Sequence, residues 1–566
     1  MEIESIPKTQ YAIQLTGPNE LRLNAEKAVN TPGPHQMLVR IECVGLCFSD
    51  LKLLSQFSSH ARKSDVLAGL SPEILAEIPS YVPNATPTVP GHEVVCRIIA
   101  VGDAVAHHRV GERCLVQADF RQLPTANSNA AFGYNFEGAL QEYVLLDERV
   151  VMNIDGERYL VPVPEHLGAS QAALVEPWAC VEDSYVNNER RTIKTGGRLL
   201  VVADAGHTVD GLTDSFDVAG LPAAVTYLAA ETAQEEALRN LGVAEVHIVD
   251  GLDDVADEAF DDITYFGAQK ATIDVLNDKL AGRGIINIVT GGAIIGQVVS
   301  VGVGRVHYGF TRWVGTRSIR AADGYAVIPE TGEIRDGDAI AVIGAGGPMG
   351  QMHVIRNICS GKKGIAVTAA DIDDRRLESL AAKCRDLAAA NGVELRFANI
   401  GNEPLNAEAS YWALMAPLGA LVADAIKNSR TGALINIFAG IPAPTRHDLD
   451  LDTYIDKRCY MFGTSGSTIE DMKIVLRKVT DGQLNTDTSV DAVAGMQGAA
   501  DGVEAVKNRS LAGKVIVYPQ LHDVGLIPLN ELRNRFPTVA EKLDDGRWCQ
   551  AAEEALLQVA GRGDSA

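Results

Sequence analysis

Apolar and polar positions follow two different patterns along this chain. Up to about residue 165, short β-rich runs such as "QMLVRIECVGL" and "EVVCRIIAVGDAV" are separated by Gly, Pro and Asp. From about 190 to 520, β-branched apolar runs alternate with Ala-, Leu- and Glu-rich stretches of helical period. That alternation indicates βαβ units around a parallel sheet. The pattern therefore predicts a compact, mostly β domain followed by a long α/β region.

An internal repeat explains the length of the α/β region. Four blocks recur in the same order, which disfavours chance similarity between unrelated βαβ units. The matching blocks are residues 195–206 with 335–347, 223–242 with 364–383, 282–292 with 430–441, and 305–318 with 454–467. We therefore predict two consecutive Rossmann-type domains, the second beginning near residue 320.

The second repeat contains a candidate phosphate-binding loop, "AVIGAGGPMGQMHVI" at 341–355. Its glycines follow an apolar run and precede a helical period, where backbone N–H groups can approach a pyrophosphate. The spacing allows two registers: either Gly344, Gly346 and Gly350 form the loop, or Ala345 takes the first place before Gly347 and Gly350. The candidate cofactor-binding residues of this loop are Gly344, Gly346, Gly347, Pro348, Met349 and Gly350.

An acidic residue follows at the spacing of a ribose-binding carboxylate. Asp371 ends the next apolar run, 21 residues beyond Gly350. Such a carboxylate accepts both adenosine ribose hydroxyls and repels a 2′-phosphate, which favours NAD over NADP. Arg375 and Arg376 weaken that preference without cancelling it.

The first repeat lacks the glycine arrangement. Its loop reads "ADAGHTVDG" and places Asp204 and Asp210 where phosphate would sit, although Glu231 keeps the position of the ribose acid. We interpret the first repeat as a degenerate domain kept for packing or substrate enclosure. The alternative is a second nucleotide site.

A metal-binding combination of residues lies in the N-terminal part. Cys47 occurs in "GLCFSD", His92 and Glu93 occur in "VPGHEVV", and Glu176 occurs in "ALVEPWACVEDS". Thiolate, imidazole and carboxylate ligands together suit a zinc site that keeps an exchangeable position, as catalysis requires.

These motifs together resemble the zinc-dependent medium-chain dehydrogenase/reductase (alcohol dehydrogenase) superfamily, in particular its sorbitol, threonine and sorbose-phosphate dehydrogenase-like branches. The resemblance rests on "GLCFSD", "GHE", "EPWACV", "GAGGPMG", "RVHY…VGT" and "GTSGSTIEDM…GKVIVYP", and it extends to about residue 519. It implies an α/β protein in which a GroES-like, β-rich catalytic domain carries the zinc and a coenzyme domain follows.

The resemblance also implies residue roles. Ser49 corresponds to the hydroxyl that passes the substrate proton outward, and Asp50 to the carboxylate that orients His92. The implied ligands of one catalytic zinc are Cys47, His92 and Glu176, with Glu93 as a fourth ligand or a close exchange partner of water.

The chain departs from this family in three places. The region after Cys114 contains none of the four cysteines of the structural-zinc lobe, so no structural zinc is expected. An insert at 53–88 separates Cys47 from His92; it is either a cap with Arg62 and Lys63 available to an anionic substrate or a solvated loop. The third departure is the extra Rossmann repeat.

Four parts are therefore expected along the chain. They are a GroES-like zinc catalytic domain at 1–190, completed by about 490–519; a degenerate Rossmann-like domain at 191–319; an NAD-binding Rossmann domain at 320–489; and a helical C-terminal extension at 520–566.

The amino-acid composition limits the kinds of partner that this protein is expected to bind. The formal net charge is −24 and no run of Lys or Arg stands out, which disfavours nucleic-acid binding. No basic segment followed by an apolar one opens the sequence, and the nine scattered cysteines form no CxxC pair. We expect a cytoplasmic protein with free thiols, no membrane partner, a small-molecule substrate and a homo-oligomeric state, either dimer or tetramer.

The predicted function is a zinc- and NAD-dependent oxidoreductase that oxidises a secondary alcohol of a polyol, sugar acid or sugar phosphate, or runs the reverse reaction. The alternative is a lyase or epimerase in which tightly bound NAD oxidises a sugar transiently. A third interpretation is a non-catalytic nucleotide-binding protein.

Overall fold

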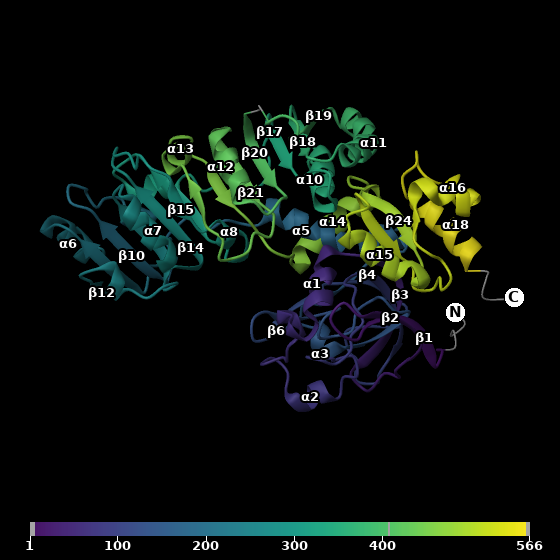
Figure 1. Ribbon diagram of the computed structural model, residues 1–566. Coiled ribbons are helices and arrows are strands. Elements are labelled where there is room, and N and C mark those ends of the chain that lie inside the picture. The colour runs from purple at the N-terminus through teal and green to yellow at the C-terminus, as the bar shows by residue number, and fades with distance from the viewer. Residues whose placement is uncertain (1–5, 406–407, 562–566) are drawn as a thin grey trace. The chain divides into compact units, whose positions relative to one another are not determined.

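The computed structural model describes residues 6–405 and 408–561 (Figure 1). The chain forms two compact units: the first comprises Met1–Glu182 and Gly466–Ala566, and the second comprises Asp183–Ser465. The boundary between them falls within helix α5 (Val175–Val186). Within the described residues, every helix is too short or too polar to cross a membrane.

The first unit is built on an eight-stranded, mainly antiparallel sheet in the order β26-β24-β25-β3-β4-β5-β9, with β8 also paired to β3. Its strands are β3 (Gln36–Gly45), β4 (Glu93–Val101), β5 (Arg113–Val116), β8 (Tyr143–Asp147), β9 (Leu160–Pro162), β24 (Val490–Ala494), β25 (Lys514–Val517) and β26 (Ile527–Pro528). Strand β25 pairs with β3 through Ile516 and Gly45, so chain from far down the sequence completes the N-terminal sheet.

Smaller elements surround this sheet. Two hairpins are β1 (Thr9–Leu15) with β2 (Leu21–Ala28) and β6 (Asp119–Pro124) with β7 (Asn129–Ala131). The helices of this unit are α1 (Phe48–Gln56), α2 (Pro72–Ala76), α3 (Glu148–Val151), α4 (Ala169–Ala173), α14 (Ile469–Thr480), α15 (Ala499–Lys507), α16 (Leu532–Arg535), α17 (Pro537–Ala540) and α18 (Gln550–Ala560).

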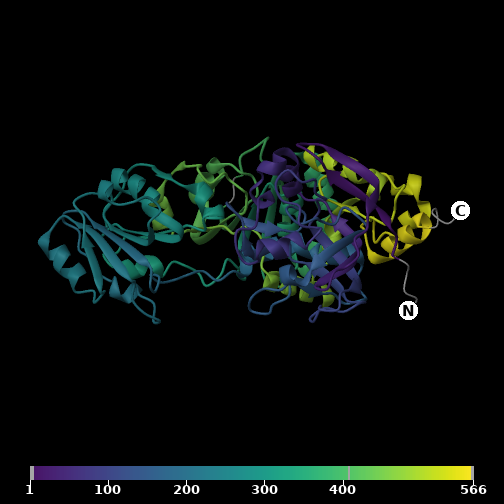
Figure 2. The same cartoon turned by 90° about the horizontal axis from the view of Figure 1, so that it is seen from below.

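The second unit contains one twelve-stranded sheet in the order β12-β11-β10-β13-β14-β16-β23-β21-β20-β17-β18-β19. Many of these strands are labelled in Figure 1, and Figure 2 shows the same cartoon from below. Its first half consists of β10 (Arg198–Ala203), β11 (Ala224–Ala229), β12 (Glu245–Ile248), β13 (Phe260–Phe266), β14 (Leu280–Val289) and β16 (Arg312–Thr316). Its second half consists of β17 (Ala339–Ile343), β18 (Ala366–Asp371), β19 (Glu394–Asn399), β20 (Ala409–Leu414), β21 (Ser429–Ile437) and β23 (Tyr460–Phe462).

Each half has the Rossmann arrangement. The strands within a half run parallel, and their order, numbered along the chain, is 3-2-1-4-5-6. The fold therefore combines a β-rich domain with two Rossmann-type halves, as the sequence predicts, and the two halves form one continuous sheet. The helices of this unit are α6 (Thr232–Arg239), α7 (Lys270–Lys279), α8 (Val303–Tyr308), α9 (Ala321–Tyr325), α10 (Pro348–Ile358), α11 (Asp374–Asn391), α12 (Gly419–Lys427) and α13 (Leu451–Asp456).

The two halves meet at an antiparallel seam. Strand β16 pairs with β23 through Trp313 and Met461, and β15 (Val299–Val301) pairs with β22 (His447–Leu449). One cluster of buried apolar side chains contains residues of both halves. The seam is therefore part of a shared core.

The halves differ at their first strand-to-helix connection. In the second half β17 leads into helix α10, whereas in the first half only the 3-10 turn Thr213–Ser215 lies between β10 and β11. The intervening sequence "DAGHTVDGLTDSFDVAGLPA" is rich in Gly and Asp and contains one Pro, all of which disfavour a helix interior. The first half thus lacks the helix at which a Rossmann fold binds pyrophosphate.

The chain returns to the first unit earlier than expected. Residues 466–489, expected in the second Rossmann domain, lie in the first unit, where the carbonyl of Ser467 accepts hydrogen bonds from Gln117 and Arg121. The extension at 520–566 also belongs to this unit. Besides its helices it adds strand β26 to the sheet, and its buried Trp548 donates to Ser170 at 3.1 Å.

Candidate metal centre and dinucleotide loop

Two adjacent strands bring the metal-binding side chains together. Strand β3 ends at Gly45, and Cys47 is the N-cap of the helix α1 that follows. On the neighbouring strand, His92 directly precedes β4 and Glu93 is its first residue. One ligand atom from each of Cys47, His92 and Glu93 lies within 4.8 Å of the other two.

Asp50 and Ser49 hold these ligands from the first turn of α1. Asp50 Oδ1 lies 3.1 Å from His92 Nδ1, which leaves Nε2 directed toward Cys47, and Asp50 Oδ2 accepts the N–H of Cys47 at 3.1 Å. Ser49 Oγ lies 3.0 Å from Cys47 Sγ and 3.1 Å from His92 Nε2. Burial by itself would lower the pKa of His92, but the Asp50 carboxylate raises this pKa well above its usual value.

The Glu93 carboxylate has a cationic partner that the sequence reasoning missed. Lys514 Nζ, at the start of β25, donates to Glu93 Oε1 at 2.5 Å and to the carbonyl of Leu46 at 2.9 Å. Burial opposes the charge of Lys514, but Glu93 outweighs it and raises the pKa of Lys514. The only available signal was a lysine opening the apolar run "KVIVYP" in one of the family-like motifs.

Glu176 lies beside this group rather than within it. It is 8% exposed and is on helix α5. Burial raises the pKa of Glu176 to about 7; Glu93 adds to the rise, while the positive charges of His92 and Lys514 oppose it. The carboxylate therefore shares the electrostatic environment of the candidate ligands, although it is not among the three atoms that converge.

The donor set fits a zinc ion. Thiolate, imidazole and carboxylate are typical zinc ligands, and Glu93 Oε2 is buried with no hydrogen-bond partner in the described structure. A buried carboxylate oxygen left without a partner is costly unless something else occupies it. Cys47, His92 and Glu93, with Glu176 adjacent, can therefore hold a metal and still leave a position for a substrate oxygen.

The glycines of the phosphate-binding loop differ in how closely neighbouring atoms approach them. Gly344 has φ +84°, which an L side chain rarely adopts. A Cβ at Gly346 would lie 2.6 Å from the Cβ of Arg376, and one at Gly350 would lie 2.7 Å from the Cα of Ala345, whereas one at Gly347 would meet its nearest neighbour only at 4.0 Å. The geometry requires glycine at 344, 346 and 350, which corresponds to the first of the two registers.

The rest of this loop forms the start of a helix. Gly347 is the N-cap of α10 and Pro348 is its first residue, a common place for proline because the missing N–H has no helical partner there. Met349 follows in the first turn. Asp371, 6% exposed at the end of β18, accepts the N–H of Gly346 at 2.8 Å. The loop, the helix terminus and the acid thus converge as a dinucleotide site needs.

The first half keeps only one of these contacts. Glu231 accepts the N–H of Gly206 at 2.9 Å, in the manner of Asp371 and Gly346. However, Asp204 follows the strand where the second half has Gly344, and its carboxylate accepts the hydroxyl of Tyr265.

The two basic residues of the insert at 53–88 have different environments. Lys63 is fully buried, and its Nζ donates to the carbonyls of Val82 and Thr86. Burial lowers the pKa of Lys63 to about 7. Lys63 is therefore not available to a substrate, in contrast to one of the two expectations, whereas Arg62 lies over the ring of Tyr134 with its Cζ 5.8 Å from the ring centroid.

Comparisons with known proteins identify similar sequences and folds. Residues 33–156 match the alcohol dehydrogenase GroES-like domain. The L-sorbose 1-phosphate reductase of Klebsiella pneumoniae is 22% identical over 337 residues, which cover 55% of this chain and 75% of the relative. An uncharacterized zinc-type alcohol dehydrogenase-like protein of Escherichia coli is 28% identical over 154 residues, covering 25% of this chain and 39% of that protein.

Among solved structures, an alcohol dehydrogenase assigned only by similarity, from Sinorhizobium meliloti, superposes with a TM-score of 0.49 at 14% identity, covering 91% of this chain and all of that one.

Proposed function

We propose that this chain, a member of the zinc-dependent medium-chain dehydrogenase/reductase superfamily, is an oxidoreductase that interconverts an alcohol and a carbonyl group. More specifically, it oxidises a secondary alcohol of a polyol, sugar acid or sugar phosphate with NAD, or reduces the corresponding ketone. The observation that carries this proposal is the convergence of Cys47, His92 and Glu93 within 4.8 Å, with Ser49 between the first two.

The metal would be held by the Cys47 thiolate, by His92 Nε2 and by a carboxylate. Glu93 offers an unpartnered oxygen, and Glu176 is the adjacent alternative. Bound zinc supplies a Lewis acid for the substrate oxygen, so that the hydroxyl proton is released near neutral pH. Asp50 fixes the His92 ring by accepting from Nδ1, which leaves Nε2 as the nitrogen that would bind the metal. Because the pKa of His92 is raised, metal binding would have to displace a proton from Nε2.

Ser49 has the position of a proton carrier. Its hydroxyl lies beside both Cys47 Sγ and His92 Nε2, where a substrate oxygen would approach. Burial raises the pKa of the neighbouring Tyr134 hydroxyl, and Ser49 partly opposes that rise. A hydroxyl can accept the substrate proton and donate its own in the same step, so Ser49 can pass the proton away from the reacting carbon.

The second Rossmann half would bind the dinucleotide. The N–H groups at the start of α10 face the position of the pyrophosphate, and Asp371 accepts from the ribose hydroxyls. NAD supplies the hydride acceptor.

A direct test combines metal content with a substrate screen. The purified protein is assayed for zinc and then offered polyols, sugar acids and sugar phosphates with NAD, with NADH absorbance as the readout. Turnover with stoichiometric zinc is expected. Product formed without net NADH would replace the dehydrogenase by the transient-oxidation alternative, and a protein with neither zinc nor turnover would contradict the proposal.

Substitution of a ligand tests the metal site itself. Cys47→Ser should remove zinc and turnover while the circular dichroism spectrum stays that of the wild type, because the thiolate is a ligand and not a core side chain. Cys549→Ser, in the C-terminal extension with its Sγ donating to a backbone carbonyl, is the matched control and should keep both. A zinc-loaded, active Cys47→Ser variant would overturn the assignment.

A further inference from the structure

Positively charged side chains lie near Tyr134 and His60, next to the candidate metal centre. Arg62 lies over the Tyr134 ring, and both Arg62 and Arg121 contact the carboxylate of Asp119. Arg62 and Lys52 act together on His60, whose pKa falls to about 4 through burial and through these two charges. Two arginines beside one carboxylate, in a protein with a formal charge of −24, favour an anionic ligand at this place.

Arg62 is held beside the metal centre by the insert. It lies in the 3-10 turn Ala61–Lys63, where its N–H donates to His60 Nδ1 at 3.2 Å. Its guanidinium lies over the Tyr134 ring, and the centroid of that ring is 5.8 Å from the centroid of His92. The Arg62 charge also opposes the rise in the pKa of Glu176. Arg62 is thus within electrostatic reach of the candidate ligands.

Asp119 cannot neutralise both arginines near it. Arg62 Nη1 lies 3.4 Å from Oδ1 of Asp119, and Arg121 Nε lies 3.2 Å from Oδ2. Both distances exceed the roughly 2.7–2.9 Å of a strong charge-assisted hydrogen bond. The side chains of Arg62 and Arg121 are 29% and 45% exposed. Two partly exposed guanidinium groups therefore share one carboxylate. Arg121 also donates from Nη2 to the carbonyl of Ser467, which leaves its Nη1 and the remaining donors of Arg62 for a further anion.

We propose that Arg62 and Arg121 form an anion subsite that binds a phosphate or carboxylate group carried by the substrate, so that the enzyme selects anionic sugar derivatives over neutral polyols. This inference rests on the proposed function. Arginine forks match both kinds of oxyanion, and the insert between Cys47 and His92 is what delivers Arg62 to this place.

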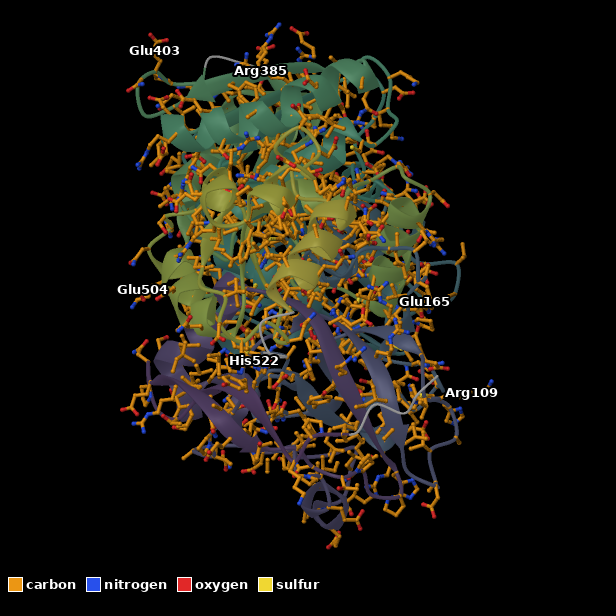
Figure 3. All side chains as sticks on the ribbon, turned by 90° about the vertical axis from the view of Figure 1, so that its right-hand side faces the viewer. Arg109, Glu165, Arg385, Glu403, Glu504 and His522 are labelled. Atoms are coloured by element: carbon orange, nitrogen blue, oxygen red, sulfur yellow. The ribbon has the colours of Figure 1, made fainter. Side chains whose placement is uncertain are left out.

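The kinetic test compares a neutral polyol with its phosphate ester and with the matching sugar acid. In Arg62→Gln and Arg121→Gln, kcat/KM for the preferred anionic substrate should fall about 50-fold, because a hydrogen-bonded charge pair is lost. For the neutral polyol it should stay within about twofold. Arg109→Gln is the matched control: Arg109 is exposed in the same unit and points away from it in Figure 3, so neither substrate should be affected.

A binding measurement separates recognition from folding. Inorganic phosphate should raise the melting temperature of the wild type and of Arg109→Gln, but not of the two subsite variants. Arg62→Lys should restore part of the phosphate effect, since it keeps the charge but not the fork.

Two outcomes would overturn the subsite. One is equal kcat/KM of the wild type for neutral and anionic substrates; the other is an equal loss for both substrates in Arg62→Gln, which would make Arg62 a packing residue on Tyr134. The absence of turnover with every alcohol would instead count against the proposed function. Which anion gives the larger loss distinguishes phosphate from carboxylate.

Discussion

The two halves of the twelve-stranded sheet share a framework but not a binding loop. Both have the strand order of a Rossmann domain, and in both an acid after the second strand accepts a glycine N–H, at 2.8 Å from Asp371 and at 2.9 Å from Glu231. Only the second half follows its first strand with Gly344, a close-packed glycine turn and helix α10.

This comparison shows that the Rossmann sheet can form without the nucleotide-binding loop. The acid and the strands persist in the first half, while the helix terminus that would face a pyrophosphate is replaced by a loop and a 3-10 turn. The seam gives a reason for the persistence: β16 pairs with β23, and the buried core of the second half includes side chains of the first. The first half therefore contributes side chains to the shared core even though it lacks a nucleotide loop.

The largest expected effect comes from breaking the seam. Trp313 is 1% exposed and pairs with Met461 across it. Trp313→Ala should lower the free energy of unfolding by about 3–5 kcal/mol, because a large buried side chain leaves a cavity. Denaturant unfolding followed by circular dichroism should show the loss for both halves together.

Ile248→Ala is the control for this prediction, since Ile248 is half exposed on the outer strand β12. If Trp313→Ala unfolded only a fraction of the sheet and left the rest at wild-type stability, the halves would not share one core.

The second-largest expected effect tests whether only the second half binds NAD. Asp371→Ala should weaken NAD binding about 10- to 100-fold, since it removes the ribose acceptor and frees the N–H of Gly346. Glu231→Ala, which removes the corresponding contact in the first half, should leave NAD affinity unchanged. Equal losses in a calorimetric titration of the two variants would mean that both halves bind nucleotide.

The smallest effect concerns the two loops. Gly206 has φ +81° with open space around it, so Gly206→Ala should cost about 1–2 kcal/mol of stability without changing NAD affinity. Gly346→Ala should instead weaken NAD binding, because its Cβ would press on Arg376 and Asp371. A thermal melt and an NAD titration on each variant measure both quantities. A loss of NAD affinity in Gly206→Ala would contradict the separation.

The features that depend on local sequence patterns could be predicted from the sequence. The GroES-like and Rossmann folds and their repetition could be read from alternation and matching blocks, and the motif around Cys47 pointed to residues that the structure brings together. The loop register could not be read, because Gly346 and Gly347 differ only in what surrounds them, namely Arg376 and Asp371 in one case and open space in the other.

Other features depend on distant parts of the chain. Lys514 contacts Glu93 because β25 pairs with β3 in the N-terminal sheet. No local sequence pattern predicts this strand pairing. Lys63 reads as a surface charge, but the insert folds so that carbonyls at 82 and 86 enclose its amine. The seam joins one strand from each repeat. The sequence of neither repeat indicates which strand forms this pairing.

Because the two halves that meet at the seam belong to one chain, their association is independent of protein concentration. Separate chains that met through a strand pair as short as Trp313 with Met461 would have to offset the lost translational and rotational freedom of two molecules. Here the linking chain keeps the partner at a high effective concentration. Dilution cannot separate the halves, so the first could lose its nucleotide loop while remaining joined to the second.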